Sequence, residues 1–282
     1  MEIRMREVHA WSIIEPVAEA VVSSNIYLPD DVKNCLQSAY KVETSESGRD
    51  ILKQLLDNAD MAAETGLPLC QDTGLAVFFV QIGSECCLKG DLSAALDEAV
   101  RLGYSRGYLR KSACHPLTRA NTGDNTPAVI HIEQIPGNDF IIKFMAKGGG
   151  SENMSRATML TPAQGWKGIK EFVLDRIAEA GPNPCPPTIV GIGIGGTFDL
   201  APILAKKALF NPLDENNADP EIADMERELL AAINEIGVGP MGLGGKTTSL
   251  GVRINMAPCH IASLPLAVNI QCHSARHAEV RM

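Results

Sequence analysis

The stretch Leu67-Pro68-Leu69-Cys70-Gln71-Asp72-Thr73-Gly74 decides how this chain is organised. An amphipathic helical pattern precedes it, and an apolar strand pattern, Ala76-Val77-Phe78-Phe79-Val80, follows it. Pro68 stiffens the backbone before the cysteine, and Gly74 permits a tight turn after it. The pattern predicts a helix-to-strand corner that presents a thiol, an amide, a carboxylate and a hydroxyl on consecutive residues. A buried cysteine in an ordinary turn explains these eight residues equally well.

The composition is that of an ordinary globular protein, with 45% apolar and 21% charged residues in a chain of 282. The net charge of −9, without a run of Lys or Arg, argues against nucleic acid or a membrane surface as the main partner. A small anionic substrate stays possible. No apolar run approaches the ~20 residues of a membrane span, and Met1 to Trp11 lacks a secretory pattern. We therefore expect a cytoplasmic protein whose eight cysteines are thiols, metal ligands or buried side chains rather than disulfides.

Periodicity predicts a helical N-terminal third that ends at Gly66, with helices over about 13–22, from Pro29 and from Thr44. Further along the chain, two strands over 128–135 and 140–145 flank Pro136-Gly137-Asn138-Asp139, which is a hairpin signal. Four further helices are predicted, from 91, from 161, over 199–209 and over 221–236. Three further strands are predicted over 188–190, 250–256 and 264–271. We expect a mixed α/β fold in a single domain, residues 1–282, in which a mainly helical lobe (1–66) packs on a mixed sheet flanked by helices (67–282).

Three glycine-rich stretches carry competing interpretations. In Lys147-Gly148-Gly149-Gly150-Ser151 the backbone N–H groups could wrap an anion or a cluster, or the stretch could be a flexible linker. Gly191-Ile192-Gly193-Ile194-Gly195-Gly196 matches a dinucleotide fingerprint, but no second strand ends in an acidic residue at the required distance. A phosphate or carboxylate at the following helix stays open. Gly244-Gly245-Lys246-Thr247 resembles the end of a phosphate-binding loop, although Pro240 stands where that motif needs its first glycine.

The remaining cysteines and histidines give weak local signals. There is no C-x-x-C pair, so a zinc ribbon or a thioredoxin-like site is not expected. His260, between Cys259 and an apolar strand, is explained locally as a core histidine.

Three separated stretches together resemble a known family: Cys70-Gln71-Asp72-Thr73-Gly74, Cys185-Pro186-Pro187 leading to Gly195-Gly196-Thr197, and a late Cys272 beyond His260. With Asn121-Thr122-Gly123 and the Lys147–Ser151 stretch between them, the chain resembles the iron–sulfur hydro-lyases of the class I fumarase and L(+)-tartrate dehydratase family. The resemblance covers nearly the whole chain and is to the α subunit, which carries the cluster.

The resemblance implies a [4Fe–4S] cluster held by three thiolates, and the matching positions are Cys70, Cys185 and Cys272. Three protein ligands would leave one iron open to substrate oxygens, as open-site metal catalysis requires. The implied reaction is the reversible addition of water to a dicarboxylate double bond.

Five further residues match substrate-site positions of that family. Gln71 and Asp72 are expected beside the substrate, and Arg110 is expected to clamp a substrate carboxylate. Gly149 is the best candidate to offer a backbone N–H to the same anion. The resemblance makes His260 a substrate-facing histidine, so Asp72 and His260 are the expected catalytic residues.

The resemblance also implies a partner, because in the family a second domain or β subunit supplies the rest of the site. We expect this chain to be inactive without its β subunit and to form an α2β2-type assembly. The sequence around Lys147 favours fumarate over L(+)-tartrate as the substrate. Two alternatives from other classes remain: a non-catalytic, cluster-binding regulatory subunit and a Rossmann-type oxidoreductase.

Overall fold

The computed structural model describes residues 5–282. The first four residues of the segment Met1 to Trp11, for which no secretory pattern was found, lie outside the described residues. The chain forms two compact units, each built from separate segments. Unit 1 comprises the described residues up to Pro29, Ala59–Gly149 and Arg276–Met282, and unit 2 comprises Asp30–Asn58 and Gly150–Ala275. The mixed α/β class is confirmed. Of the N-terminal helices, residues 14–26 belong to unit 1 and residues 30–42 belong to unit 2.

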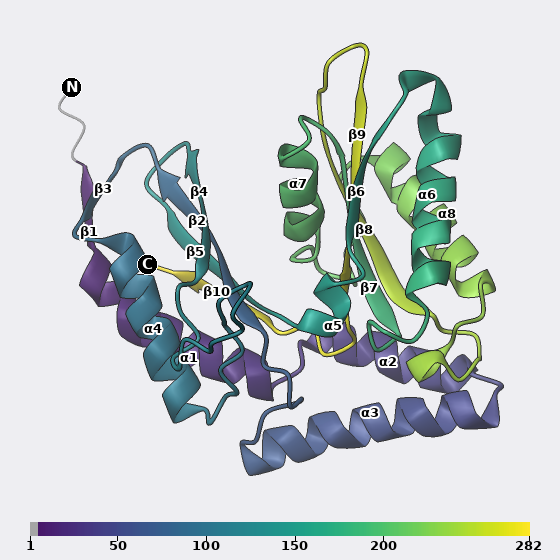
Figure 1. Cartoon of the computed structure of the whole chain (residues 1–282), viewed down its shortest axis with the longest axis horizontal. Coiled ribbons are helices and arrows are strands. Elements are labelled where there is room, and N and C mark those ends of the chain that lie inside the picture. Colours follow the sequence, from purple (N-terminus) through teal and green to yellow (C-terminus); the bar gives the residue numbers. More distant parts are fainter. Residues whose placement is uncertain (1–4) are drawn as a thin grey trace. The chain divides into compact units, whose positions relative to one another are not determined.

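Unit 1 is built on a four-stranded sheet in the order β10-β5-β2-β4 (Figure 1). Strand β2 pairs parallel with β4 and antiparallel with β5, and β5 pairs antiparallel with β10. Helices α1 and α4 pack their apolar faces on this sheet, where Val17 and Leu96 join Phe78 and Phe144 in one buried core. Helix α4 begins as expected, because the Asp91 side chain accepts the Ala94 N–H at 3.0 Å. The elements are β1 (Arg6–His9), η1 (Ala10–Ile13), α1 (Ile14–Ile26), β2 (Leu75–Gly83), β3 (Cys86–Lys89), α4 (Leu92–Arg106), β4 (Val129–Ile135), β5 (Phe140–Lys147) and β10 (His277–Arg281).

The expected hairpin between β4 and β5 is wrong, since β2 lies between the two strands. The reason lies at Gly83, the last residue of β2. Its N–H donates to the Asp139 carbonyl at 2.7 Å, and a side chain on Gly83 would place Cβ only 2.3 Å from the Gly137 carbonyl oxygen. The missing side chain lets the end of β2 enter the turn, so the turn connects two strands that flank β2 instead of pairing with each other.

Unit 2 is a three-layer structure around a four-stranded sheet in the order β6-β9-β7-β8 (Figure 1). Helices α6 and α8 bury one face of this sheet, and α7 covers the other. Helix α3 (Glu46–Thr65) has residues in both units. The other elements are α2 (Asp30–Val42), α5 (Gly149–Glu152), β6 (Arg156–Leu160), η2 (Pro162–Gln164), α6 (Gly165–Ala180), β7 (Thr188–Gly195), α7 (Leu200–Ala208), α8 (Pro220–Glu235), η3 (Pro240–Gly242), β8 (Ser249–Ala257) and β9 (Leu264–Gln271).

The glycines of the apparent dinucleotide fingerprint belong to strand β7 and serve helix packing. Val190, Ile192 and Ile194 point into the core with α6 and α8. The alternating glycines face α7, where a Cβ on Gly193 would lie 2.0 Å from the Ala201 carbonyl oxygen. The motif therefore provides a close helix–strand contact within a strand instead of a phosphate-binding turn after one.

The second apparent phosphate motif binds a carboxylate of the chain itself. The Lys246 N–H donates to Glu43 at 2.8 Å, and the N–H groups of Thr44 and Ser45 donate to the other oxygen at 2.8 and 2.9 Å. Glu43 is 4% exposed. Burial raises its pKa, but these backbone donors outweigh burial and hold the pKa below its usual value. The glycines of this loop thus bring backbone donors to a buried glutamate.

Among residues 5–282, no helix combines the length and the apolar character that crossing a membrane requires.

Candidate active site

The corner predicted around Cys70 lies in unit 1, between helix α3 and strand β2, and its centre is the carboxylate of Asp72. One carboxylate oxygen accepts the Gly74 N–H at 3.0 Å, and the other accepts the Gly149 N–H at 2.8 Å. Gly74 has a positive φ of 71°, and a Cβ there would lie 2.7 Å from the Lys147 backbone. Glycine at position 74 thus allows the corner to pack directly on the strand that leads to Gly149.

Buried side chains hold the two carbonyl groups that end the corner. The Tyr104 hydroxyl donates to the carbonyls of Thr73 and Gly74, at 2.7 and 3.0 Å, and Asn125 Nδ2 donates to the Gly74 carbonyl at 3.2 Å. Burial raises the pKa of Tyr104 far above its usual value, so the phenol stays protonated and remains a donor. The Thr73 hydroxyl donates to the Arg110 carbonyl at 2.9 Å, which ties the chain at Arg110 to the same corner.

The reactive groups of the corner remain accessible. The Cys70 thiol is partly buried and lies 3.4 Å from both the Gln71 Oε1 and the Asp72 backbone N. The side chains of Gln71 and Arg110 are exposed. Unit 1 therefore brings four predicted site residues, Cys70, Gln71, Asp72 and Arg110, to one corner. Gly149 joins them differently from the expectation, because its N–H already donates to Asp72 instead of being free for a substrate anion.

Unit 2 carries the other two predicted metal ligands, and the fold places their chain segments together. Cys185 precedes β7 and Cys272 follows β9, and these strands pair so that Ile189 lies opposite Gln271. The His273 Nδ1 lies 3.1 Å from the Cys185 carbonyl oxygen. The Cys272 thiol is partly buried, 3.0 Å from the Ser274 hydroxyl, and Cys185 is exposed.

The chemistry of these three cysteines fits an iron–sulfur cluster, because thiolates are the usual cluster ligands and all three side chains carry a thiol that is not fully buried. Residues 5–282 contain no preformed group of three or more His, Cys, Asp or Glu side chains arranged for a single metal ion. Cys70 belongs to unit 1, and Cys185 and Cys272 belong to unit 2.

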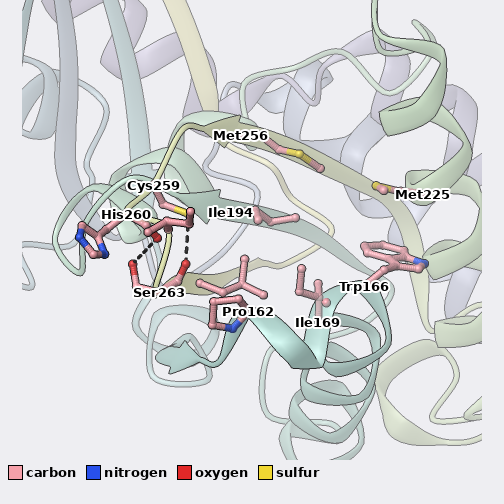
Figure 2. A pocket seen from close by; sticks show the side chains of 12 residues that line it. Pro162, Trp166, Ile169, Ile194, Met225, Met256, Cys259, His260 and Ser263 are labelled. Atoms are coloured by element: carbon pink, nitrogen blue, oxygen red, sulfur yellow. Dashed lines mark hydrogen bonds between the residues drawn. The ribbon is translucent and has the colours of Figure 1, made fainter.

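His260 is separated from Cys272 by the whole length of β9. The histidine lies in the loop before Leu264, and seven residue steps along the strand correspond to about 23 Å. His260 is exposed, which makes its interpretation as a core histidine wrong. It lines one end of an apolar cavity of about 370 Å³, opposite Trp166 and Met225 (Figure 2). The structure therefore does not join His260 to the cysteines of its own unit.

Sequence reasoning missed the residues that hold the corner: Tyr104, Asn125 and Arg276. Each is almost fully buried, and each donates to a backbone carbonyl of Asp72, Thr73 or Gly74. Buried polar side chains are uncommon unless they are paired, but a sequence does not tell which polar residues become buried. The position of Arg276, four residues after a predicted metal ligand, was the one available signal.

Comparison with known proteins gives a consistent result over almost the whole chain. Residues 14–281 match the family model described as Fumerase, fumarate hydratase. A Methanocaldococcus jannaschii protein, provisionally named as the alpha subunit of L(+)-tartrate dehydratase, is 47% identical over 278 residues, which cover 96% of this chain and 97% of the relative. Two Escherichia coli proteins named L(+)-tartrate dehydratase subunit alpha are 33% identical in strain UTI89 and 34% identical in strain K12, with 96% and 94% of this chain and 90% and 88% of the relatives covered. The chain belongs to the Fumerase family of fumarate hydratases and tartrate dehydratase alpha subunits.

Proposed function

We propose that this chain is the cluster-binding α subunit of a hydro-lyase that acts on four-carbon dicarboxylates. The observation that carries the proposal is the corner in unit 1, where a partly exposed thiol and an exposed amide flank an aspartate fixed by two backbone N–H groups, and where the backbone of the exposed Arg110 is tied to the same corner. Family membership supports a hydro-lyase in general. The cofactor, the substrate and the individual residue roles belong to the proposal.

We assign the cluster ligands to Cys70, Cys185 and Cys272. When bound, a [4Fe–4S] cluster with one open iron would act as a Lewis acid toward a substrate hydroxyl or carboxylate oxygen. The protein supplies orientation. The Arg110 guanidinium is suited to hold a substrate carboxylate through two parallel hydrogen bonds, and the Gln71 amide can donate to a substrate oxygen.

Asp72 is the proposed acid–base or orienting group on the substrate hydroxyl. Both of its oxygens accept backbone N–H groups, so its carboxylate cannot rotate freely and its remaining lone pairs have fixed directions. In this proposal Gly149 positions Asp72. His260 contributes to the substrate site only if another chain of the assembly brings it there, because it lies at the far end of β9 from Cys272.

The first substrate to test is L(+)-tartrate, although the sequence around Lys147 favoured fumarate. The family model is described as fumarate hydratase, but the individual relatives described above are all named for L(+)-tartrate dehydratase. The names of the relatives therefore favour L(+)-tartrate as the substrate. Loss of water from tartrate gives an enol that becomes 2-oxosuccinate, and addition of water to fumarate gives malate. Both reactions require two carboxylate contacts and one activated hydroxyl, which the proposed residues can supply in part.

The α-subunit names of the relatives support a β subunit as partner. We propose that the β chain completes the substrate contacts, in an assembly of α2β2 type.

The test is activity of the α chain with and without its β subunit, after anaerobic reconstitution with iron and sulfide. Consumption of L(+)-tartrate and of fumarate is followed in parallel, and the α chain with Asp72→Asn is the matched variant. We expect turnover of one substrate by the wild-type pair and a large loss in Asp72→Asn. A loaded pair that converts neither substrate would instead support a regulatory, cluster-binding subunit. An α chain that is fully active alone would contradict the need for the partner.

A further inference from the structure

Arg276 is the largest fully buried side chain among residues 5–282, with 1% of its surface exposed. A buried guanidinium requires partners, since removing the charge from water is costly. One of its terminal nitrogens donates to the Asp72 backbone carbonyl, while its Nε has no hydrogen-bond partner among the described residues. Arg276 begins the last segment of unit 1, and its carbonyl accepts the Ala146 N–H at 2.9 Å. The arginine thus connects the Asp72 corner to strand β5.

The guanidinium and the Asp72 carboxylate lie on the same side of Gly148. The position of a Cβ on Gly148 would be 3.0 Å from Arg276 Nη2 and 3.2 Å from Asp72 Oδ2. Arg276 Nη2 and Asp72 Oδ2 are therefore at most 6.2 Å apart, the sum of these two distances. The Gly149 N–H donates to the same carboxylate oxygen. Arg276 is the cation beside the oxygen that the glycine stretch positions.

The charges of Arg276 and Asp72 both influence the nearby Tyr104 hydroxyl. Burial has the largest effect on the pKa of Tyr104 and raises it. Arg276 lowers this pKa by its charge, and Asp72 raises it. Both charges therefore act on the hydroxyl that holds the other carbonyls of the corner.

We propose that Arg276 is a positioning residue of the active site: it holds the backbone of Asp72 by hydrogen bonding and fixes the Asp72 carboxylate by its charge. The predicted effect of Arg276 on turnover rests on the proposed function, whereas its predicted effect on the stability of the chain does not. Because Arg276 is 1% exposed, it acts through Asp72 and does not touch the substrate. Displacement of a catalytic group by about 1 Å can lower the rate about 100-fold, so loss of Arg276 should affect turnover strongly.

The test is a double-mutant cycle between Arg276→Met and Asp72→Asn, with Arg276→Lys as the conservative variant. Arg176→Met is the matched control, because Arg176 is 4% exposed and pairs with Glu179 at 2.7 Å, but lies on α6 in unit 2. Its Nε, like that of Arg276, has no hydrogen-bond partner in the described part of the chain. Each variant is measured twice: by kcat and KM of the cluster-loaded complex with the β subunit, and by denaturant unfolding of the α chain without iron.

We expect Arg276→Met to lower kcat/KM about 100-fold in the wild-type background but only a fewfold in the Asp72→Asn background, since both changes remove the same arrangement. Arg276→Lys should recover at least tenfold of the loss, and Arg176→Met should leave kcat/KM within a fewfold of wild type. The effects of Arg276→Met and Asp72→Asn on the unfolding equilibrium constant should also be non-additive, by about tenfold. Equal effects of Arg276→Met in both backgrounds would overturn the inference.

The two measurements separate this inference from the proposed function. If the loaded wild-type complex converts no dicarboxylate, the proposed function fails, and the unfolding cycle still decides whether Arg276 and Asp72 are coupled. If Arg276→Met does not fold, the same cycle is carried out with Arg276→Lys. Additive unfolding energies in that cycle would overturn the inference.

Discussion

Replacement of Asp72 by asparagine tests whether the carboxylate organises the corner. The side chain keeps its size, but one carboxylate oxygen becomes an NH2 group, which cannot accept a hydrogen bond. Either the Gly74 N–H or the Gly149 N–H, now at 3.0 and 2.8 Å from the carboxylate, then loses its acceptor. A hydrogen bond to a charged group contributes about 1.5–3 kcal/mol. Because Asp72 is partly exposed, we expect a loss near the lower end of that range.

The assay is urea unfolding of the iron-free chain combined with amide hydrogen exchange. Asp72→Asn should lower the free energy of unfolding and speed exchange at Gly74 or Gly149, since the affected N–H loses protection. The control is Asp175→Asn on the exposed face of α6, which should stay within about 0.5 kcal/mol of wild type. Unchanged stability together with unchanged exchange at both glycines would refute the role assigned to the carboxylate.

Three further predictions test other parts of the structure. Gly193→Ala would place a methyl group 2.0 Å from the Ala201 carbonyl oxygen, so it should lower the free energy of unfolding in urea by about 1–3 kcal/mol. Gly149→Ala is the control, because its Cβ would approach only Asp72, at 3.9 Å, and the loss of stability should be much smaller. The folded-state pKa of Glu43 lies below its usual value of 4.5, so its contribution to stability is present above that pH and is lost as the pH falls through the lower, folded-state value. Glu43→Gln should therefore be less stable than wild type at neutral pH and lose less stability on acidification, and an unchanged pH profile would contradict this. Gln271 is 1% exposed with both polar side-chain atoms unpaired among the described residues, so Gln271→Leu in the iron-free chain should leave the melting temperature unchanged or raise it; a clear decrease would show a missed partner.

The sequence predicted most elements because their signals are local. The Asp91 cap, the helix start at Thr44, the β-branched start of β7 and the apolar stretches of β8 and β9 act through neighbouring residues. The strand order was not predictable in the same way. Pro136–Asp139 has the composition of a hairpin turn, but the order of β2, β4 and β5 depends on Gly83, more than 50 residues earlier in the chain. A long-range backbone contact overrides the local turn signal.

The glycine motifs show why a motif alone does not identify a ligand. Gly193 is needed because α7 lies against β7, and Gly245 is needed because Glu43 lies against its backbone. In both cases the group that lies against the glycine backbone belongs to another segment of the chain and is not a ligand. The resemblance identified the family correctly, since it used the order of several motifs instead of one.

The candidate site was predictable where its residues are consecutive and unpredictable where the fold assembles it. Cys70, Gln71 and Asp72 lie together because they are neighbours in sequence. Arg276 reaches Asp72 across 204 residues, through the pairing of β10 with β5. The separation of His260 from Cys272, in contrast, follows from the strand predicted over 264–271, because residues before and after one extended strand lie at its opposite ends.

We propose that Cys70, Cys185 and Cys272 hold one cluster, which is tested by measuring iron and acid-labile sulfide per α chain after anaerobic reconstitution. Wild type is compared with Cys70→Ser, Cys185→Ser and Cys272→Ser, and with Cys259→Ser as the control for an exposed thiol outside the proposed ligand set. We expect about four iron and four sulfide per chain in wild type and in Cys259→Ser, and loss of most of both in each of the other three variants. Full iron and sulfide content in any one of those three variants, or none in wild type, would contradict it.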